Sequence, residues 1–185
     1  MEYFDIVDEE GSPTGSIISR SKAHANDILH RTAHVWIIRK GHSGTQVLLQ
    51  KRSENKDSFP GCWDTSSAGH IPAGDIPADS ARRKLEEELG IRASAEELQP
   101  AGTFRIHYED SFHGVPFRDN EIAFLYVYEK PVILDELKLQ EEEVSDVRWF
   151  DLDEVYQRIR KGDPLICADI KGVECLMNWL QKRSQ

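Results

Sequence analysis

The sequence predicts a single layered domain that mixes strands with helices, of the α/β or α+β class. Its length of 185 residues suits one domain with a sizeable core. The composition, 39% hydrophobic and 30% charged, is that of a soluble globular protein. Strand-like and helix-like segments are interspersed along the chain without an internal repeat or a low-complexity linker. We therefore treat residues 1–185 as one domain.

Strand signals dominate the first half of the chain. Runs rich in β-forming residues are bounded there by glycine, proline and acidic residues, a pattern typical of strands and turns. From the N-terminus the sequence predicts two short strands around an Asp-Glu-Glu-Gly turn within 3–18, a loop or short helix over 19–28, a hairpin over 34–52 that turns at Gly41 to Gly44, a Pro-Gly turn within 57–63, and a short extended segment over 63–69.

Helices and strands are both predicted in the second half. Pro77 suits the first turn of a helix that runs to Leu89, and Gly90 follows as its stop. The last helix carries an apolar stripe at helical spacing, which predicts packing against a core. The other elements predicted here are strands over 102–109 and 121–130 joined by a long polar loop, a strand over 147–152, a helix over 151–163 and the last helix at about 171–181.

The charge balance restricts the partners. A formal net charge of −10 predicts a field that repels nucleic acid, phosphates and anionic membranes. No apolar run approaches the roughly 20 residues of a membrane span, and the acidic N-terminus lacks a secretory signal. Three cysteines in no metal-ligand spacing favour a reducing cytoplasm without disulfides. We expect a small-molecule substrate and neither nucleic acid nor membrane as partner, and an anionic substrate would need a local cation.

Three consecutive glutamates, Glu86 to Glu88, require an explanation because like charges on one helix turn repel each other. One interpretation is a solvated face whose charges pair with Arg83 and Lys84 one turn earlier. The other is a site for Mg²⁺, which prefers carboxylate oxygens and substrate phosphates. The loop before the helix favours the second interpretation, because a glycine such as Gly69 lets a backbone carbonyl approach a metal closely.

The segment from Gly69 to Ile91 resembles the signature of the Nudix hydrolases. In that family a glycine is followed, after five residues, by a glutamate. Seven more residues precede Arg-Glu, an aliphatic residue, any residue, Glu-Glu, any residue, glycine and an aliphatic residue. Asp75 stands where the first glutamate is expected, and Lys84 stands where the glutamate after the arginine is expected. The positions that match without a shift in spacing are Gly69, Arg83, Leu85, Glu87, Glu88, Gly90 and Ile91.

This resemblance implies an α/β/α sandwich around a mixed sheet, with residues 69–91 as a loop–helix–loop. It also implies hydrolysis of a diphosphate linkage in a nucleoside diphosphate-type or related small molecule, with Mg²⁺ or Mn²⁺ as cofactor. The chemistry agrees, because metal ions neutralise a diphosphate and lower the pKa of the attacking water. The resemblance places Arg83 among the catalytic residues and suggests as metal-binding residues Gly69, Glu87, Glu88 and Glu121.

The flanking sequence resembles a narrower group, the isopentenyl-diphosphate isomerase-like branch. The segments that carry this likeness are 29–37, 56–70, 118–121 and 141–155. Isomerases of this type bind a metal through histidines and acids, and the matching positions here are His30, His70, Asp119 and Glu121. The catalytic cysteine expected just before Gly-His is Ala68. Because allylic isomerisation needs groups that add and remove protons, which alanine cannot do, hydrolysis is favoured over isomerisation.

Lys84 leaves the signature without a general base, because a charged lysine has no hydrogen-bond acceptor. It also predicts fewer or weaker metal ions than a complete signature would bind. Glu143 and Glu121 are then the candidates for activating water. Isomerisation stays open as an alternative, and Lys84 keeps open a binding domain without turnover. The sequence does not define the oligomeric state, which leaves a homodimer open.

Substrate contacts are predicted from charge and aromatic content. Strand-end cations suit phosphate oxygens, and a histidine beside Gly69 could touch phosphate or metal. The predicted phosphate-binding residues are Lys51, Arg52, His70 and Arg105. The polar loop over 107–120 carries three aromatic residues that could stack a base or line an apolar pocket, namely Tyr108, Phe112 and Phe117.

Overall fold

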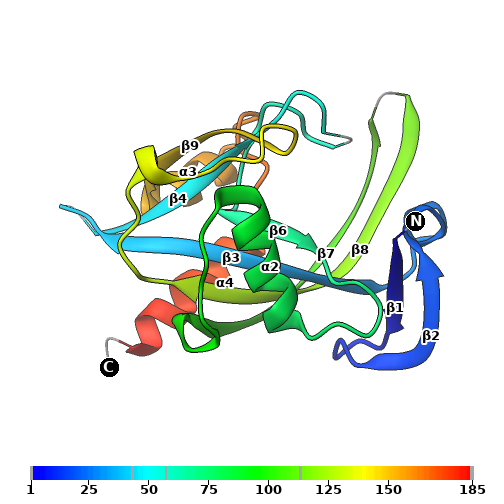
Figure 1. Ribbon diagram of the computed structural model, residues 1–185. Coiled ribbons are helices and arrows are strands. Elements are labelled where there is room, and N and C mark those ends of the chain that lie inside the picture. Colours follow the sequence, from blue (N-terminus) through cyan, green and yellow to red (C-terminus); the bar gives the residue numbers. More distant parts are fainter. Residues whose placement is uncertain (1, 43, 57, 113, 184–185) are drawn as a thin grey trace.

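A mixed sheet forms the middle layer of the computed structural model, and helices cover both of its faces (Figure 1). The structure describes residues 2–42, 44–56, 58–112 and 114–183. The strands are β1 (Tyr3–Val7), β2 (Pro13–Ser19), β3 (His30–Lys40), β4 (Thr45–Arg52), β5 (Trp63–Asp64), β6 (Ser67–His70), β7 (Leu98–Phe112), β8 (Val115–Tyr128) and β9 (Val144–Asp151). The helices are α1 (Arg20–Ala25), α2 (Pro77–Leu89), α3 (Leu152–Arg160) and α4 (Ile170–Arg183), with short 3₁₀ turns at Ala95–Glu97 and Leu134–Glu136.

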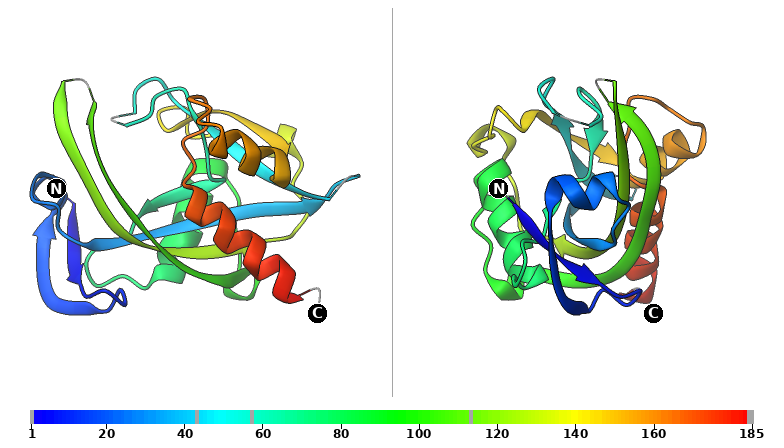
Figure 2. Two further views of the ribbon diagram at one scale, coloured as in Figure 1. Left: turned by 180° about the vertical axis from the view of Figure 1, so that it is seen from behind. Right: turned by 90° about the vertical axis from the view of Figure 1, so that its right-hand side faces the viewer.

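The described residues form a seven-stranded sheet and a separate two-stranded one. In the large sheet the order is β5-β4-β3-β8-β7, with β6 paired to β3 and β9 paired to β4. Strands β3 and β8 run parallel, and the other pairs are antiparallel. Helix α2 packs on one face, and α3 and α4 pack on the other (Figure 2). The predicted α/β/α sandwich and its loop–helix–loop segment are confirmed.

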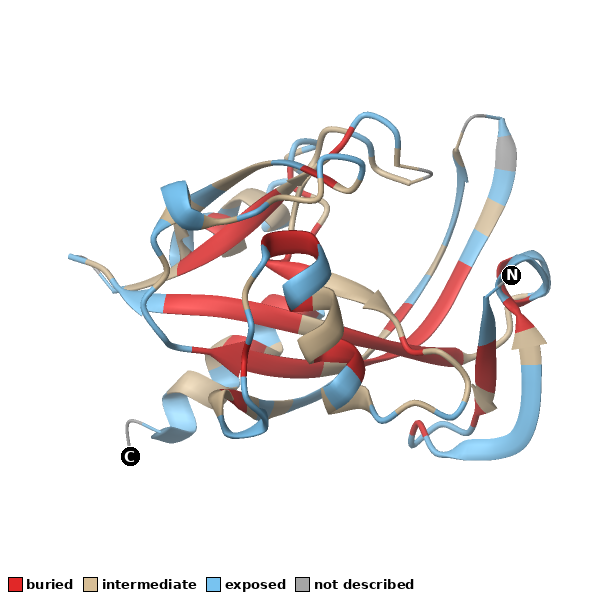
Figure 3. Cartoon of the chain, in the orientation of Figure 1, coloured by how far each residue is buried: buried red, intermediate tan, exposed pale blue. Residues whose placement is uncertain are grey.

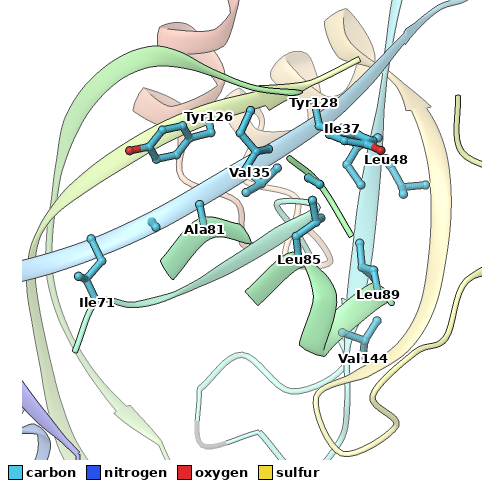
Figure 4. Close-up of a cluster of buried hydrophobic side chains, with 13 residues drawn as sticks. Val35, Ile37, Leu48, Ile71, Ala81, Leu85, Leu89, Tyr126, Tyr128 and Val144 are labelled. Atoms are coloured by element: carbon cyan, nitrogen blue, oxygen red, sulfur yellow. The ribbon is translucent and has the colours of Figure 1, made fainter. Parts of the chain in front are cut away.

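Alternating side chains of the central strand divide the core between the two faces. Val35 and Ile37 point toward α2, whereas Trp36 between them points toward α3 and α4. Leu85 and Leu89, four residues apart, form the stripe by which α2 packs on the sheet (Figure 4). Both leucines are fully buried, and such burial contributes about 1.5–3 kcal/mol for each side chain. This packing fixes which face of α2 points away from solvent.

The helix ends agree with the sequence signals. Helix α2 starts at Pro77 and stops before Gly90, which has φ +73° in the left-handed region. Helix α4 extends one residue before and two residues beyond the predicted range of 171–181. The segment left open as a loop or short helix contains α1. The hairpin predicted over 34–52 is present as β3 and β4, although position 43 in its turn lies outside the described residues.

The long polar loop predicted between 109 and 121 is wrong. Strands β7 and β8 remain paired along this whole segment, from Leu98↔Tyr128 to Phe112↔Val115. The hairpin extends away from the body of the protein, and its outer part is largely exposed (Figure 3). Exposed strands of this kind carry charged residues on their solvent side, so their polarity resembles that of a loop.

The β1–β2 hairpin is attached to the sheet by a buried ion pair. Arg31 Nη2 on β3 lies 2.7 Å from Asp5 Oδ2 on β1, and both side chains are at most about one-tenth exposed. The same Asp5 oxygen accepts a hydrogen bond from the Gly74 amide at 2.9 Å, in the loop before α2. Because breaking a buried ion pair leaves an uncompensated charge, this contact holds β1, β3 and that loop together.

Two further expectations concern composition. The three cysteines are free thiols, in agreement with the expected absence of disulfides. Among the described helices, none combines the length and apolar character needed to cross a membrane.

Candidate active site

Three histidines and two acids from four elements meet at one end of the sheet. His24 comes from α1, His30 from β3, His70 from β6, and Asp119 and Glu121 from β8. One ligand atom from each histidine and one from Asp119 lie within 4.8 Å of one another. Glu121 Oε1 lies 3.4 Å from His70 Nε2 and 3.6 Å from His30 Nε2. We call these five residues the histidine cluster.

Backbone carbonyls orient two of the imidazoles. His24 Nδ1 lies 3.1 Å from the Arg118 carbonyl oxygen, and His30 Nδ1 lies 2.8 Å from that of Ile28. A carbonyl oxygen only accepts, so each Nδ1 carries the hydrogen and each Nε2 presents a lone pair. A carbonyl in this position is the usual partner of a metal-ligating histidine.

The electrostatics of the histidine cluster suit a cation. Burial, and the neighbouring histidines, lower the pKa of His24 to about 4. Burial likewise lowers the pKa of His70. Burial and the repulsion from Glu121 raise the pKa of Asp119 to about 9, which marks two carboxyl groups that lack a shared positive partner. Neutral imidazoles and deprotonated carboxylates are the forms that bind a divalent ion, so metal binding here would release the proton of Asp119.

The donor atoms of the cluster are also unsatisfied. His24 Nε2, His30 Nε2, His70 Nε2 and Asp119 Oδ1 are buried and have no hydrogen-bond partner within the described part of the chain. Buried polar atoms without a partner are costly, so a convergent set of them indicates a missing ligand. These residues therefore fit a metal ion. Imidazole nitrogens together with carboxylate oxygens suit Mn²⁺, Fe²⁺ or Zn²⁺ better than Mg²⁺.

Phe4 on β1 packs directly on the histidine cluster. Its ring centroid lies 4.9 Å from that of His30 and 4.6 Å from that of His70, with interplanar angles of 9° and 17°. The phenylalanine is fully buried. A large side chain in such close contact restricts the rotation of both imidazoles, so the N-terminal strand takes part in arranging the ligands.

Replacing Phe4 by leucine should weaken Mn²⁺ binding by about 10–100-fold, the range seen when groups that orient metal ligands are lost. Titration calorimetry on metal-free protein measures this affinity. Val7→Ala, a buried position on the same strand, controls for general destabilisation and should leave the affinity unchanged. Equal affinity in Phe4→Leu and wild type would contradict the orienting role.

Helix α2, which carries Glu86 to Glu88 and is called the glutamate-rich helix below, contributes one buried carboxylate. Glu88 is 3% exposed and lies on the same side of α2 as Leu85. Its Oε2 accepts hydrogen bonds from Ser67 Oγ at 2.8 Å and from Gln50 Nε2 at 3.1 Å. Burial raises the pKa of Glu88 to about 7, although the two hydrogen bonds and nearby lysines oppose this rise.

The charged residues at the other signature positions of segment 69–91 form ion pairs with one another. Lys84 Nζ lies 3.2 Å from Glu87 Oε2, and Arg83 lies 2.7 Å from Asp75 Oδ2 and 3.8 Å from Glu87 Oε1. Gly69 is in contact with Lys84, because a Cβ at residue 69 would stand 2.7 Å from Lys84 Cε. The glycine thus makes room for a lysine side chain, whereas the sequence suggested room for a metal.

The histidine cluster and the glutamate-rich helix open into one cavity of about 530 Å³. Its polar lining includes His70, Glu121, Glu88, Lys84, Gly69, Arg52, Lys56 and Glu143. Glu143 is ion-paired with Lys56, and this contact lowers its pKa against the opposing effect of burial. Arg52 Nη1 lies 3.0 Å from Asp64 Oδ2. Among the described residues, four basic side chains, those of Arg20, Arg52, Lys56 and Lys84, line this cavity together with eight acidic ones.

Four of the predicted site residues do not line the cavity: Lys51, Arg83, Glu87 and Arg105. Arg105 donates to Asn120 Oδ1 and pairs with Glu9. Its neighbour Ile106 lines the cavity, so Arg105 points to the other face of β7. Lys51 differs in the same way from its neighbour Arg52, which does line the cavity. Their positions do not support the predicted phosphate contacts of Lys51 and Arg105.

Aromatic side chains form another part of the cavity wall. Phe59, Tyr108 and Phe117 line it, and Phe112 packs 4.9 Å from Phe59 between ring centroids. Phe117 stacks on His24 at 4.4 Å. Tyr108 and Phe117, two of the three aromatic residues predicted for a loop, thus line the cavity from a hairpin, and the third, Phe112, packs against Phe59 and Phe117.

Sequence reasoning missed four residues of this site, Phe4, His24, Lys56 and Phe59. His24 lies in a segment without a motif, and its only signal is its place six residues before His30. Phe59 lies in the turn-rich segment before β5, in a left-handed conformation with φ +47°. That conformation is rare for a bulky residue and could not be read from composition.

The fold is that of a Nudix-type hydrolase. The NUDIX domain family matches residues 28–168, so the chain belongs to the Nudix hydrolase family. One relative, Nudix hydrolase 3 of Arabidopsis thaliana, is 38% identical over 175 residues, which cover 92% of this chain. The chain spans only 22% of that relative's length.

Other comparisons agree with the branch and the fold. An isopentenyl-diphosphate Delta-isomerase of Dinoroseobacter shibae is 31% identical over 144 residues, covering 78% of this chain and 76% of the relative. The crystal structure of DR0079 from Deinococcus radiodurans is 18% identical, with a TM-score of 0.63 over 87% of this chain and 90% of that one. The NUDIX domain of Shewanella oneidensis NrtR, crystallised with ADP ribose, has a TM-score of 0.58 at 18% identity, covering 91% of this chain and all of that one.

Proposed function

We propose that this protein hydrolyses the diphosphate linkage of a small organic diphosphate with the help of a divalent metal ion. The observation that carries the proposal is that the histidine cluster and helix α2 line one and the same cavity. One part of its lining holds unpartnered imidazole and carboxylate donors, and another holds Arg52, Lys56 and Lys84. A ligand that suits both is a polyanion that binds to a metal and to fixed cations at once.

The residues divide into distinct roles. The histidine cluster would hold a divalent ion, with Mn²⁺ favoured by its mixed nitrogen and oxygen donors and Mg²⁺ as the weaker candidate. A divalent ion supplies charge neutralisation for the diphosphate and lowers the pKa of water. Arg52 and Lys56 bind and orient the phosphates. Glu143 accepts the proton of the attacking water, because it is ionised, partly exposed and outside the histidine cluster.

The non-phosphate half of the substrate contacts the aromatic wall formed by Phe59, Tyr108 and Phe117. Aromatic faces accept either a nucleobase by stacking or an apolar chain by burial. The structure of NrtR with ADP ribose and the Dinoroseobacter isomerase represent these two kinds of diphosphate. We therefore include both kinds in the test.

Isomerisation of an allylic diphosphate is the second candidate, and the intact histidine cluster together with the Dinoroseobacter relative favours it. Against it stands Ala68, which lines the cavity beside His70 and offers no group that can transfer a proton.

A phosphate-release assay with nucleoside and isoprenoid diphosphates, run with Mn²⁺ and with Mg²⁺, should detect hydrolysis of at least one substrate. Glu143→Gln should lower turnover by about 10²–10⁴-fold and leave KM nearly unchanged, as expected for a lost general base. Glu129→Gln, an exposed glutamate at the end of β8, serves as the matched control.

Isotope exchange in D₂O with isopentenyl diphosphate distinguishes the second candidate. We expect no label to enter either isomer in wild-type protein. Label without phosphate release would replace hydrolysis by isomerisation. Saturable binding without any product would indicate a binding domain without turnover.

A further inference from the structure

Lys84 has an unusual position for a surface-helix lysine. Its methylene groups lie against Gly69, where any side chain would collide with them. Its ammonium group is 3.2 Å from Glu87 Oε2, and the side chain is 26% exposed where it lines the cavity. Because the side chain is held along β6, the charge is fixed in place before a ligand arrives.

The carboxylates around Lys84 each have a partner in the chain. Glu87 pairs with Lys84, Glu143 pairs with Lys56, and Glu88 accepts from Ser67 and Gln50. Within the described residues, the one group of three or more potential ligands whose donor atoms converge is in the histidine cluster. A metal ion at the helix would therefore have to displace Lys84 from Glu87, or Ser67 and Gln50 from Glu88, before either carboxylate could bind it.

We propose that the Lys84 ammonium takes the place of a metal ion at the glutamate-rich helix and binds the substrate diphosphate directly. The protein then carries one metal ion, at the histidine cluster, and a covalently attached cation at the helix. This inference rests on the proposed function for the identity of the substrate, but its metal stoichiometry and its pyrophosphate binding do not depend on turnover.

Local charge supports this arrangement. Each of the two ammonium groups faces one carboxylate, Lys84 facing Glu87 and Lys56 facing Glu143. A divalent cation here would meet both ammonium groups at short range and gain little. A diphosphate would instead meet the Lys84 ammonium, whose three hydrogens allow it to donate to a phosphate oxygen while it still contacts Glu87.

Metal stoichiometry and pyrophosphate affinity test the proposal. Mn²⁺ is titrated into metal-free protein and counted by electron paramagnetic resonance, and inorganic pyrophosphate binding is measured by calorimetry on Mn²⁺-saturated protein. Wild type should bind one Mn²⁺ per chain, and Glu87→Gln should bind the same number. Lys84→Glu should gain a second Mn²⁺.

Lys84→Met keeps the methylene packing over Gly69 and removes only the charge. It should weaken pyrophosphate binding about 10–100-fold, the usual loss for a charge-assisted hydrogen bond, with one Mn²⁺ still bound. Lys84→Arg should retain most of the affinity, and Lys161→Met, an exposed lysine after α3, should retain all of it.

Two results would overturn the proposal. The first is a second Mn²⁺ in wild type that disappears in Glu87→Gln, and the second is unchanged pyrophosphate affinity in Lys84→Met. Absence of hydrolysis with every diphosphate would reject the proposed function, yet both measurements would still decide the role of Lys84.

Discussion

Replacing Glu121 by glutamine should lower Mn²⁺ affinity by about 10–100-fold and turnover by at least about 10²-fold. Glu121 accepts a hydrogen bond from Thr32 Oγ1 at 3.0 Å and faces His30 and His70 with its other oxygen. Although burial opposes it, the contact with the two histidines holds the pKa of Glu121 well below its ordinary value, so the group is a carboxylate. Glutamine has the same shape but brings no negative charge.

Two measurements separate metal loss from misfolding in this variant. Calorimetric Mn²⁺ titration gives the affinity, and circular dichroism of metal-free protein reports the fold. Glu109→Gln, an exposed position on β7, should match wild type in both. Unaltered Mn²⁺ affinity in Glu121→Gln would remove Glu121 from the metal site, whether or not the protein turns over any substrate.

Replacing Glu88 by glutamine should stabilise the metal-free protein at pH 8 by up to about 3 kcal/mol. The pKa of Glu88 is raised from 4.5 to about 7 in the folded state, and each pKa unit corresponds to about 1.4 kcal/mol. A raised folded pKa gives stability that is complete below pH 4.5 and is lost as pH rises through about 7. Glutamine does not ionise and avoids this loss.

Urea unfolding at pH 5 and pH 8 in the presence of a chelator measures the effect. The advantage of Glu88→Gln over wild type should be large at pH 8 and small at pH 5. Glu87→Gln is the matched control, because Glu87 is the preceding residue on the same helix and its side chain is 43% exposed. Equal stability of Glu88→Gln and wild type at both pH values would contradict a costly buried carboxylate.

Local sequence signals predicted most of the fold. The start at Pro77, the stop at Gly90 and the apolar stripe of α4 depend on neighbouring residues, and the structure reproduces them. The inner parts of β7 and β8 were predicted as strands, whereas their outer parts were assigned to a loop, because the ladder of backbone hydrogen bonds does not depend on side-chain polarity. A segment in which apolar residues alternate with acidic ones fits a polar loop as well as it fits an exposed strand.

The site was less predictable than the fold. His30, His70, Asp119 and Glu121 were found by resemblance, and the structure brings them together with His24, which no local pattern singled out. Position in a helix of six residues gives His24 no periodic signal. Arg105 has the right charge but faces away from the cavity, because side-chain direction in a long strand depends on register.

The position of the N-terminal strand has a practical consequence for purification. Glu2 lines the cavity, and Phe4 stacks on two imidazoles two residues later. A polyhistidine tag fused in front of residue 1 would place extra metal-binding groups beside the histidine cluster, where they would compete for the same ion. The end of α4 lies far from this site along the sheet (Figure 1). A tag after residue 185, or one removed by a protease, should therefore give cleaner metal titrations.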